Sequence, residues 1–179
     1  LAIVHLMNRK PQKAIAILAA TRMAELPKEM REQRLLLESR ALMGANRFDQ
    51  AIDVLASLKG PEVDRMRGDI LWSAKRWRQA GEAIELMLGE RWKDEEPLTE
   101  LERHDVLRAG LAYALAGEAL ALTRLREKYG NKMEGGPEKA AFDQIATSPG
   151  PRAIGAATKV LANIDSLAVF LKMYQARYP

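Results

Sequence analysis

Histidine is the side chain best placed to move protons near neutral pH, and this sequence has only two, His5 and His104. They lie far apart along the chain, so they do not form a pair for metal binding or acid–base catalysis. His5 stands among Leu1, Ile3, Val4 and Leu6, which is typical of the flank of a packed helix. We therefore predict no metal site and no catalytic histidine.

Other residue types with chemical potential lack the required spacing. Carboxylates gather at 94–96 and at Glu100 and Glu102, but the first group lies in an expected loop and the second at a helix start, where acids favour the helix dipole. The glycines between 130 and 136 lack the spacing of a nucleotide-binding loop. There is no cysteine, which excludes disulfides and thiolate sites. We expect no enzyme activity and no cofactor.

Basic residues surround Trp77 in the stretch 75–78, a combination that can stack on nucleic-acid bases. The net charge of +4 is a small surplus spread along the chain, and Glu82 and Glu85 follow this stretch closely. We therefore expect no nucleic-acid partner. No apolar run approaches the length of a spanning helix, so we also expect no membrane insertion by this segment.

Helix formers dominate the composition, alternating strand patterns are absent, and 47% of the residues are hydrophobic. The sequence predicts an all-α fold. Prolines mark the helix starts at Pro11, Pro27, Pro61, Pro137 and Pro151, and Thr99 with Glu102 predicts a capping box. The expected helices cover 1–8, 11–25, 28–45, 48–58, 62–75, 77–90, 99–116, 118–129, 138–146, 151–163 and 165–177.

Two segments at helix starts match each other. Residues 46–51 and 75–80 both place an aromatic residue, Phe48 or Trp77, three positions before an alanine, Ala51 or Ala80. Residues 10–14 repeat this segment without the aromatic residue. Such recurrence is typical of arrays of helical hairpins, in which short links make neighbouring helices antiparallel.

The helices before these segments carry small residues at matching places, Ser39, Gly68 and Gly110. With the aromatic–alanine segments, this pattern resembles the tetratricopeptide repeat. The resemblance implies an α-solenoid of about four hairpins over 1–129, the first one truncated, in which each small residue lets two helices cross closely. We expect 130–179 to form a C-terminal helical cap, with one side of its last helix docked on the array through Leu167, Phe170, Leu171, Tyr174 and Tyr178.

First helices of stacked hairpins line the concave wall. Counting from the three small residues gives the inward positions Gln33, Leu36, Arg40, Met43, Glu62, Arg65, Asp69, Trp72, His104, Leu107, Leu111 and Ala114. The residues expected to contact a partner are Gln33, Arg40, Met43, Arg65, Asp69, Trp72 and His104. Trp72 is either part of this groove or part of the core, and the arginines favour a peptide with acidic groups.

The leading hypothesis is a scaffold or adaptor that binds another protein or a peptide in this groove. Two alternatives remain, a purely structural or self-associating segment of a larger repeat protein and a docking domain of an upstream enzyme. Because Leu1 opens the chain inside an expected helix, we expect a C-terminal fragment of a longer bacterial protein. Its compartment stays open, with the periplasm or cell envelope slightly favoured.

Overall fold

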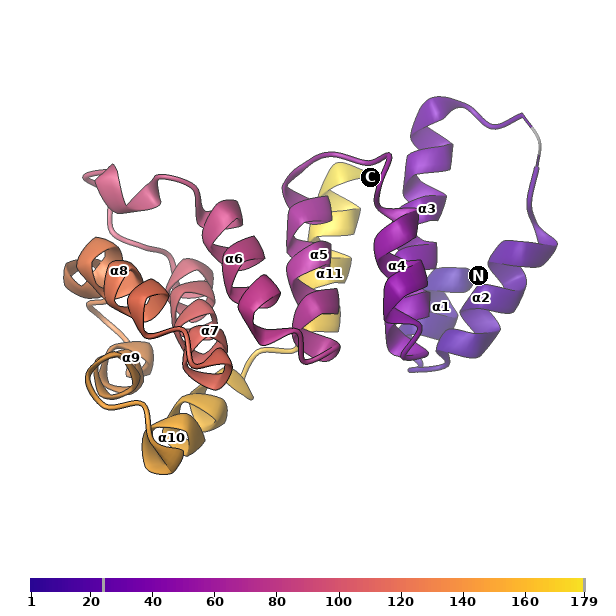
Figure 1. Ribbon diagram of the computed structural model, residues 1–179. Helices are drawn as coiled ribbons and strands as arrows, with labels where there is room; N and C mark the ends of the chain where they lie inside the picture. The colour runs from indigo at the N-terminus through magenta and orange to yellow at the C-terminus, as the bar shows by residue number, and fades with distance from the viewer. Residues whose placement is uncertain (24, 179) are drawn as a thin grey trace. The chain divides into compact units, whose positions relative to one another are not determined.

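The computed structural model describes residues 1–23 and 25–178, and this part of the chain is all-α, with 75% helix and no strand (Figure 1). The expected all-α class is therefore confirmed. The described residues form, in order, α1 (Ala2–Met7), α2 (Pro11–Ala20), α3 (Lys28–Gly44), α4 (Phe48–Val54), α5 (Pro61–Ser73), α6 (Trp77–Leu88), α7 (Glu100–Ala116), α8 (Ala119–Tyr129), α9 (Pro137–Thr147), α10 (Pro151–Leu161) and α11 (Ser166–Arg177).

Local sequence signals determine where these helices begin. Pro11, Pro61, Pro137 and Pro151 each occupy the first turn of a helix, where the missing N–H costs no hydrogen bond. Thr99 and Glu102 form the expected capping box, in which each side chain accepts from the other residue's backbone N–H.

Two helices end earlier than expected. α2 stops at Ala20 instead of residue 25. The next residue, Thr21, donates its hydroxyl to the carbonyl of Ile17. Residue 24 lies outside the described part of the chain. α4 stops at Val54 instead of 58, because its continuation tightens into turns that leave Leu55 and Leu58 buried.

The chain forms two compact units, and the first comprises Leu1–Ala74 and Ser166–Pro179. Its core contains alanines with no exposed surface on α2, α3 and α4, which let these helices approach closely. The buried hydroxyl of Ser39 on α3 donates to the carbonyl of Ala51 on α4 at 2.9 Å. Helix α11 contacts α5, and Figure 1 draws it in yellow behind α5.

The docking side expected for the last helix is confirmed. Phe170 and Tyr174 are buried members of the core of the first unit, and Leu167, Leu171 and Tyr178 pack against that core.

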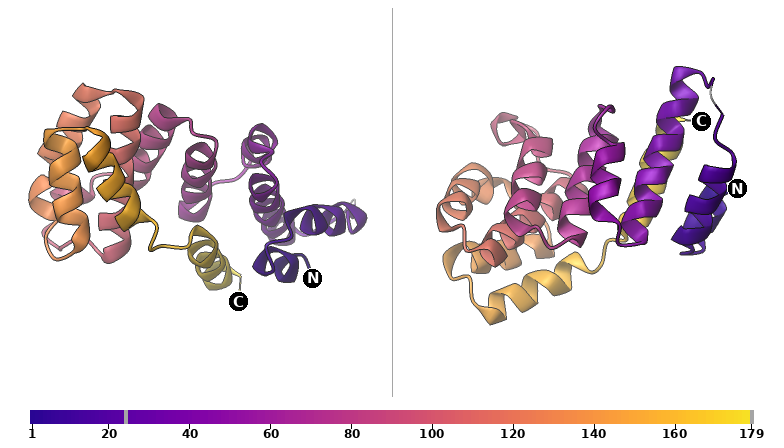
Figure 2. Two further views of the ribbon diagram at one scale, coloured as in Figure 1. Left: turned by 90° about the horizontal axis from the view of Figure 1, so that it is seen from below. Right: turned by 45° about the vertical axis from the view of Figure 1, so that its right-hand side comes forward.

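The second unit, Lys75–Asp165, is organised around α7. Every residue from His104 to Tyr113 is buried, because α6, α8, α9 and α10 all contact this helix (Figure 2). The buried stretch includes the polar side chains of His104, Asp105 and Arg108 as well as apolar ones. Gly110 lies under Phe142 of α9, whose ring atoms would be 3.1 Å from an added Cβ.

The expected division of the chain into an array and a cap at residue 129 stays a prediction. One boundary of the two units falls between α5 and α6, inside a pair that the repeat alignment treats as one hairpin. Helices α9 and α10 contact α7 in the second unit, whereas α11 belongs to the first unit. Pairing that joins residues this far apart in the sequence is not encoded in local spacing.

Candidate binding surface

Helices α3 and α5 place two opposite charges on one buried surface of the first unit. Nη1 of Arg40 lies 3.8 Å from Oδ2 of Asp69, and the two side chains are 8% and 5% exposed. Burying either charge without the other would be costly, so each of the two side chains compensates the burial of the other.

Arg40 also contacts the first turns of α11. Its Nη2 donates to the Oγ of Ser166 at 3.2 Å, and its guanidinium carbon lies 5.6 Å from the centre of the Phe170 ring. A guanidinium over an aromatic face is an attractive arrangement. One buried arginine therefore binds both a hydroxyl and an aromatic ring of α11.

Two acidic residues bind the C-terminal end of α11. Nη2 of Arg177 donates to Glu32 at 3.2 Å, and Nη1 of Arg177 pairs with the buried carboxylate of Glu62. Gly60 lies beside this pair with φ of +134°, and an added Cβ would stand 2.7 Å from the arginine. Only glycine meets both requirements at position 60.

Aromatic side chains connect the two ends of α11. The ring centres of Phe170 and Tyr174 are 5.8 Å apart, and those of Tyr174 and Tyr178 are 5.2 Å apart. Burial raises the pKa of Tyr174 to about 12, so its hydroxyl stays protonated at all physiological pH values. We call the surface of α3 and α5 around Glu32, Arg40, Glu62 and Asp69 the inner face.

The inner face contains some of the residues expected to contact a partner. Arg40, Met43 and Asp69 are buried there, in the unit that also holds α11, whereas Gln33, Arg65 and Trp72 on the same two helices are half-buried. His104 is not among them, because it belongs to the second unit. Its Nε2 lies 3.3 Å from the carbonyl oxygen of Leu161 on α10.

Sequence reasoning missed the roles of Glu32, Ser166 and Arg177. Glu32 and Arg177 are far apart in the chain, and nothing local indicates that they meet. The available signal was the position of Arg177 one turn after Tyr174, at the edge of the apolar side of α11.

Space remains beside the first turn of α11. A cavity of about 170 Å³ is lined by Leu6, Arg9, Pro11, Arg40, Gly44 and Leu167. The helix therefore does not fill the whole surface next to Arg40.

A second polar cluster holds α6, α7 and α8 together in the second unit. Glu85 accepts hydrogen bonds of 2.8 Å from the Tyr113 hydroxyl, from Arg124 and from Lys128. Burial raises the pKa of Glu85, but these three donors outweigh it and lower the pKa to about 2. The carboxylate therefore has its donors within the chain, as expected of a structural link.

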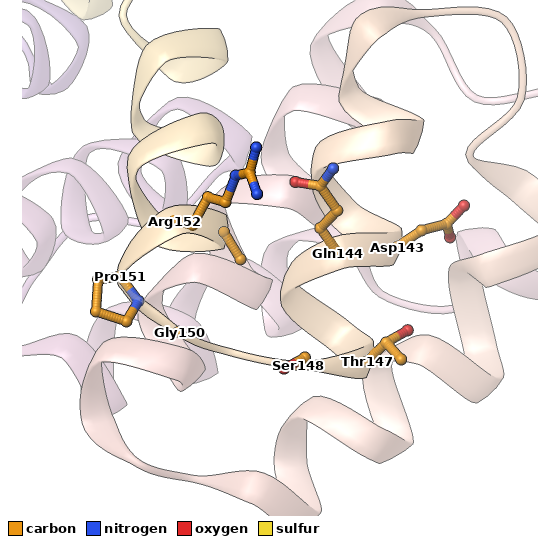
Figure 3. A pocket seen from close by; sticks show the side chains of 8 residues that line it. Asp143, Gln144, Thr147, Ser148, Gly150, Pro151 and Arg152 are labelled. Carbon is orange, nitrogen blue, oxygen red and sulfur yellow. The ribbon is translucent and has the colours of Figure 1, made fainter.

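Two further hollows lie in the second unit. An open one of about 770 Å³ runs between α9 and α10, where Figure 3 shows Gln144 and Arg152 on its rim. A smaller one, of about 320 Å³, includes His104, Arg103 and Glu138. Nε of Arg103 and Oε2 of Glu138 lie 3.7 Å apart, and both atoms are buried.

Within residues 1–23 and 25–178, no three metal-binding side chains lie close enough to hold an ion. In the same residues no single helix is long and apolar enough to span a membrane; α10 and α11 together satisfy length and composition only. Comparison of the chain with protein-family models, curated proteins and solved structures finds no match.

Proposed function

We propose that this chain is a protein-interaction module that binds an amphipathic helix of another polypeptide on the inner face. The observation that supports this is the seating of α11, which the inner face contacts through buried charges at both ends and aromatic rings between them. Apolar packing alone would stabilise a helix here more simply, because buried ion pairs contribute little net stability. Their value lies in selecting which helix binds.

The contacts of α11 define the chemistry of such a partner. It carries aromatic residues at two positions one turn apart, as at Phe170 and Tyr174, followed by a cation in the place of Arg177. Glu32 and Glu62 favour that cation. The acidic peptide expected from the arginines is a poorer match, because Arg40 already faces Asp69.

A tetratricopeptide-like array is the framework that we propose for this surface. The contact between Ser39 and Ala51 supports it, because a small residue there brings α3 and α4 together as the repeat requires. Consecutive helices from α1 to α5 also contact one another, as hairpin stacking predicts.

The test is binding of a labelled peptide of residues 166–178 to the full chain carrying Phe170→Ala and Tyr174→Ala, which weakens the seating of its own α11. We expect saturable binding with a Kd of about 10 μM or tighter, about −7 kcal/mol. Binding should also raise the melting temperature of the variant.

The matched control is the same peptide with Arg177 changed to Glu. It should bind at least about tenfold more weakly, and a chain that also carries Glu32→Lys and Glu62→Lys should restore its binding. If the variant chain stays folded and the unchanged peptide does not bind, α11 is a fixed part of the core and the proposal fails.

A structural role in a larger assembly is the second candidate. Helix α1 and the residue before it expose apolar side chains, with Leu1 82%, Val4 51% and Met7 60% exposed. The end of a helical array needs a polar outer face to remain in water, and these side chains are apolar. Replacing Val4 and Met7 by Lys should leave peptide binding unchanged under the interaction hypothesis.

A further inference from the structure

The hollow of about 320 Å³ in the second unit lies where three helices meet. The first turn of α7, the start of α9 and the end of α10 surround it, and these helices all contact one another. We call it the polar hollow. Its walls include Arg103, His104, Gly136, Glu138, Val160 and Ile164. None of its lining residues belongs to the inner face, so it is a separate place in the molecule.

Two opposite charges in the polar hollow come close without a hydrogen bond between them. Nε of Arg103 and Oε2 of Glu138 are 3.7 Å apart, whereas an N–H···O bond spans about 2.7 to 3.2 Å. Both atoms are buried, Glu138 is only 5% exposed, and neither atom has a hydrogen-bond partner among the residues that the structure describes. Buried polar atoms are normally hydrogen-bonded. The pair therefore indicates a position for a further polar group.

Neighbouring groups hold both side chains in place. Nη1 of Arg103 donates to the carbonyl of Leu98 at 2.8 Å, which limits how far Nε can move towards the carboxylate. Oε2 of Glu138 lies against Gly136, where an added Cβ would clash with it and stand 3.3 Å from Nε of Arg103. The backbone of Gly136 is extended, so glycine is needed here for space and not for its φ.

The two atoms require a donor and an acceptor from whatever lies between them, because the N–H of Arg103 donates and the carboxylate of Glu138 accepts. The two charges compensate each other, so a charged ligand would bring an uncompensated charge into a buried site. A primary carboxamide is neutral and carries an acceptor oxygen and a donor nitrogen on one carbon. A hydroxyl would have to serve both atoms from a single oxygen.

The polar hollow has room for more than one polar group. A water molecule takes up about 30 Å³ in the liquid, so the hollow exceeds the volume of one bridging water about tenfold. Val160 and Ile164 are half-buried and give it an apolar wall. Sites for small molecules combine such walls with a few placed polar groups. The occupant therefore has an apolar part beside its polar group.

We propose that the polar hollow binds a small neutral molecule that carries a primary carboxamide. The carboxamide oxygen accepts from Nε of Arg103, and its nitrogen donates to Oε2 of Glu138. The apolar part of the molecule rests on Val160 and Ile164. This site acts independently of the inner face, so loss of helix binding there leaves it intact.

The test compares four benzene derivatives that differ in their polar group. Benzamide carries the carboxamide, benzoate is its charged analogue without a donor, acetophenone has only the acceptor, and benzyl alcohol has a hydroxyl. Each is titrated into the isotope-labelled full chain, and the backbone amide signals of Gly135, Gly136 and Glu138 report binding. We expect a Kd of about 1 mM or tighter for benzamide and at least about tenfold weaker binding of the other three.

The variant Glu138→Gln tests the assigned contacts. It removes the negative charge and leaves Arg103 uncompensated, so benzoate should bind at least about tenfold more tightly than it binds the wild type and should overtake benzamide. The matched control is Glu134→Gln, since Glu134 is exposed in the same loop and does not line the hollow. It should leave all four affinities unchanged.

The wild-type titrations decide the proposal even if Glu138→Gln does not fold. If benzamide at tenfold the expected Kd shifts none of the three amide signals, the hollow holds water only and the proposal is overturned. Equal binding of the four compounds would show an apolar site without the assigned hydrogen bonds. Tighter binding of benzyl alcohol than of benzamide would overturn the carboxamide as the ligand.

Discussion

Gly81 on α6 tests how closely α6 and α7 pack. A Cβ added at this position would lie 2.7 Å, 2.9 Å and 3.0 Å from three ring atoms of Tyr113. Carbon atoms normally remain about 3.5 to 4.0 Å apart. The ring is 1% exposed and its hydroxyl is bonded to Glu85, so it has little freedom to move.

Two effects of Gly81→Ala oppose each other. Alanine is favoured over glycine inside a helix by about 1 kcal/mol. Overpacking of a core costs about 1 to 3 kcal/mol, and displacing the Tyr113 hydroxyl from the charged Glu85 costs about 1.5 to 3 kcal/mol more. The clash outweighs the propensity, and we expect a net loss of about 1.5 to 5 kcal/mol.

The matched control is Gly155→Ala in α10, where an added Cβ meets nothing within 4 Å. Only the propensity acts there, so this variant should gain about 0.5 to 1 kcal/mol. Urea unfolding followed by circular dichroism measures both changes. Equal stabilisation by the two substitutions would refute the packing of Tyr113 on Gly81 and with it the tight contact of α6 and α7.

Two more predictions concern buried charges. The pKa of Glu85 is lowered from 4.5 to about 2, so its stabilising effect is full above pH 4.5 and is lost as the pH falls towards 2. Because solvent partly screens this site, the free energy of unfolding should fall by about 1 to 2 kcal/mol over this pH range. The stability of Glu85→Gln, measured over the same pH range, should not show this fall. Arg40→Ala should cost about 3 to 5 kcal/mol by removing one charge of its buried pair with Asp69, and urea unfolding should show a smaller cost for Arg40→Met with Asp69→Leu. If the cost of the double substitution equals the sum of the costs of the two single substitutions, Arg40 and Asp69 are not coupled.

Helix positions were predictable because their signals are local. Pro61 fixes its own φ and the sequence around it needs no distant partner to begin α5. Thr99 and Glu102 cap α7 within one turn. The ends were harder, since Thr21 stops α2 by a side-chain bond that competes with another turn of helix.

The inner face was predictable only in part. Counting from Ser39 and Gly68 placed Arg40 and Asp69 on one surface, because helical periodicity alone determines which residues share a side. The same counting included His104, which belongs to another unit. Periodicity says which way a residue faces but not what covers it, and α11 covers Arg40 from more than a hundred residues away.

On the inner face, the apolar contacts of α11 contribute stability, whereas the charged contacts contribute selectivity. Phe170 and Tyr174 are the buried residues of α11, and each buried aromatic side chain contributes about 1.5 to 3 kcal/mol. Arg40 and Glu62 add little net stability, because their desolvation offsets most of the attraction. They do set a penalty on any helix that brings the wrong charge or register. A surface built only to hold its own C-terminal helix needs no such penalty, since the covalent link already determines which helix arrives. The buried charges are better explained if the inner face must choose among helices.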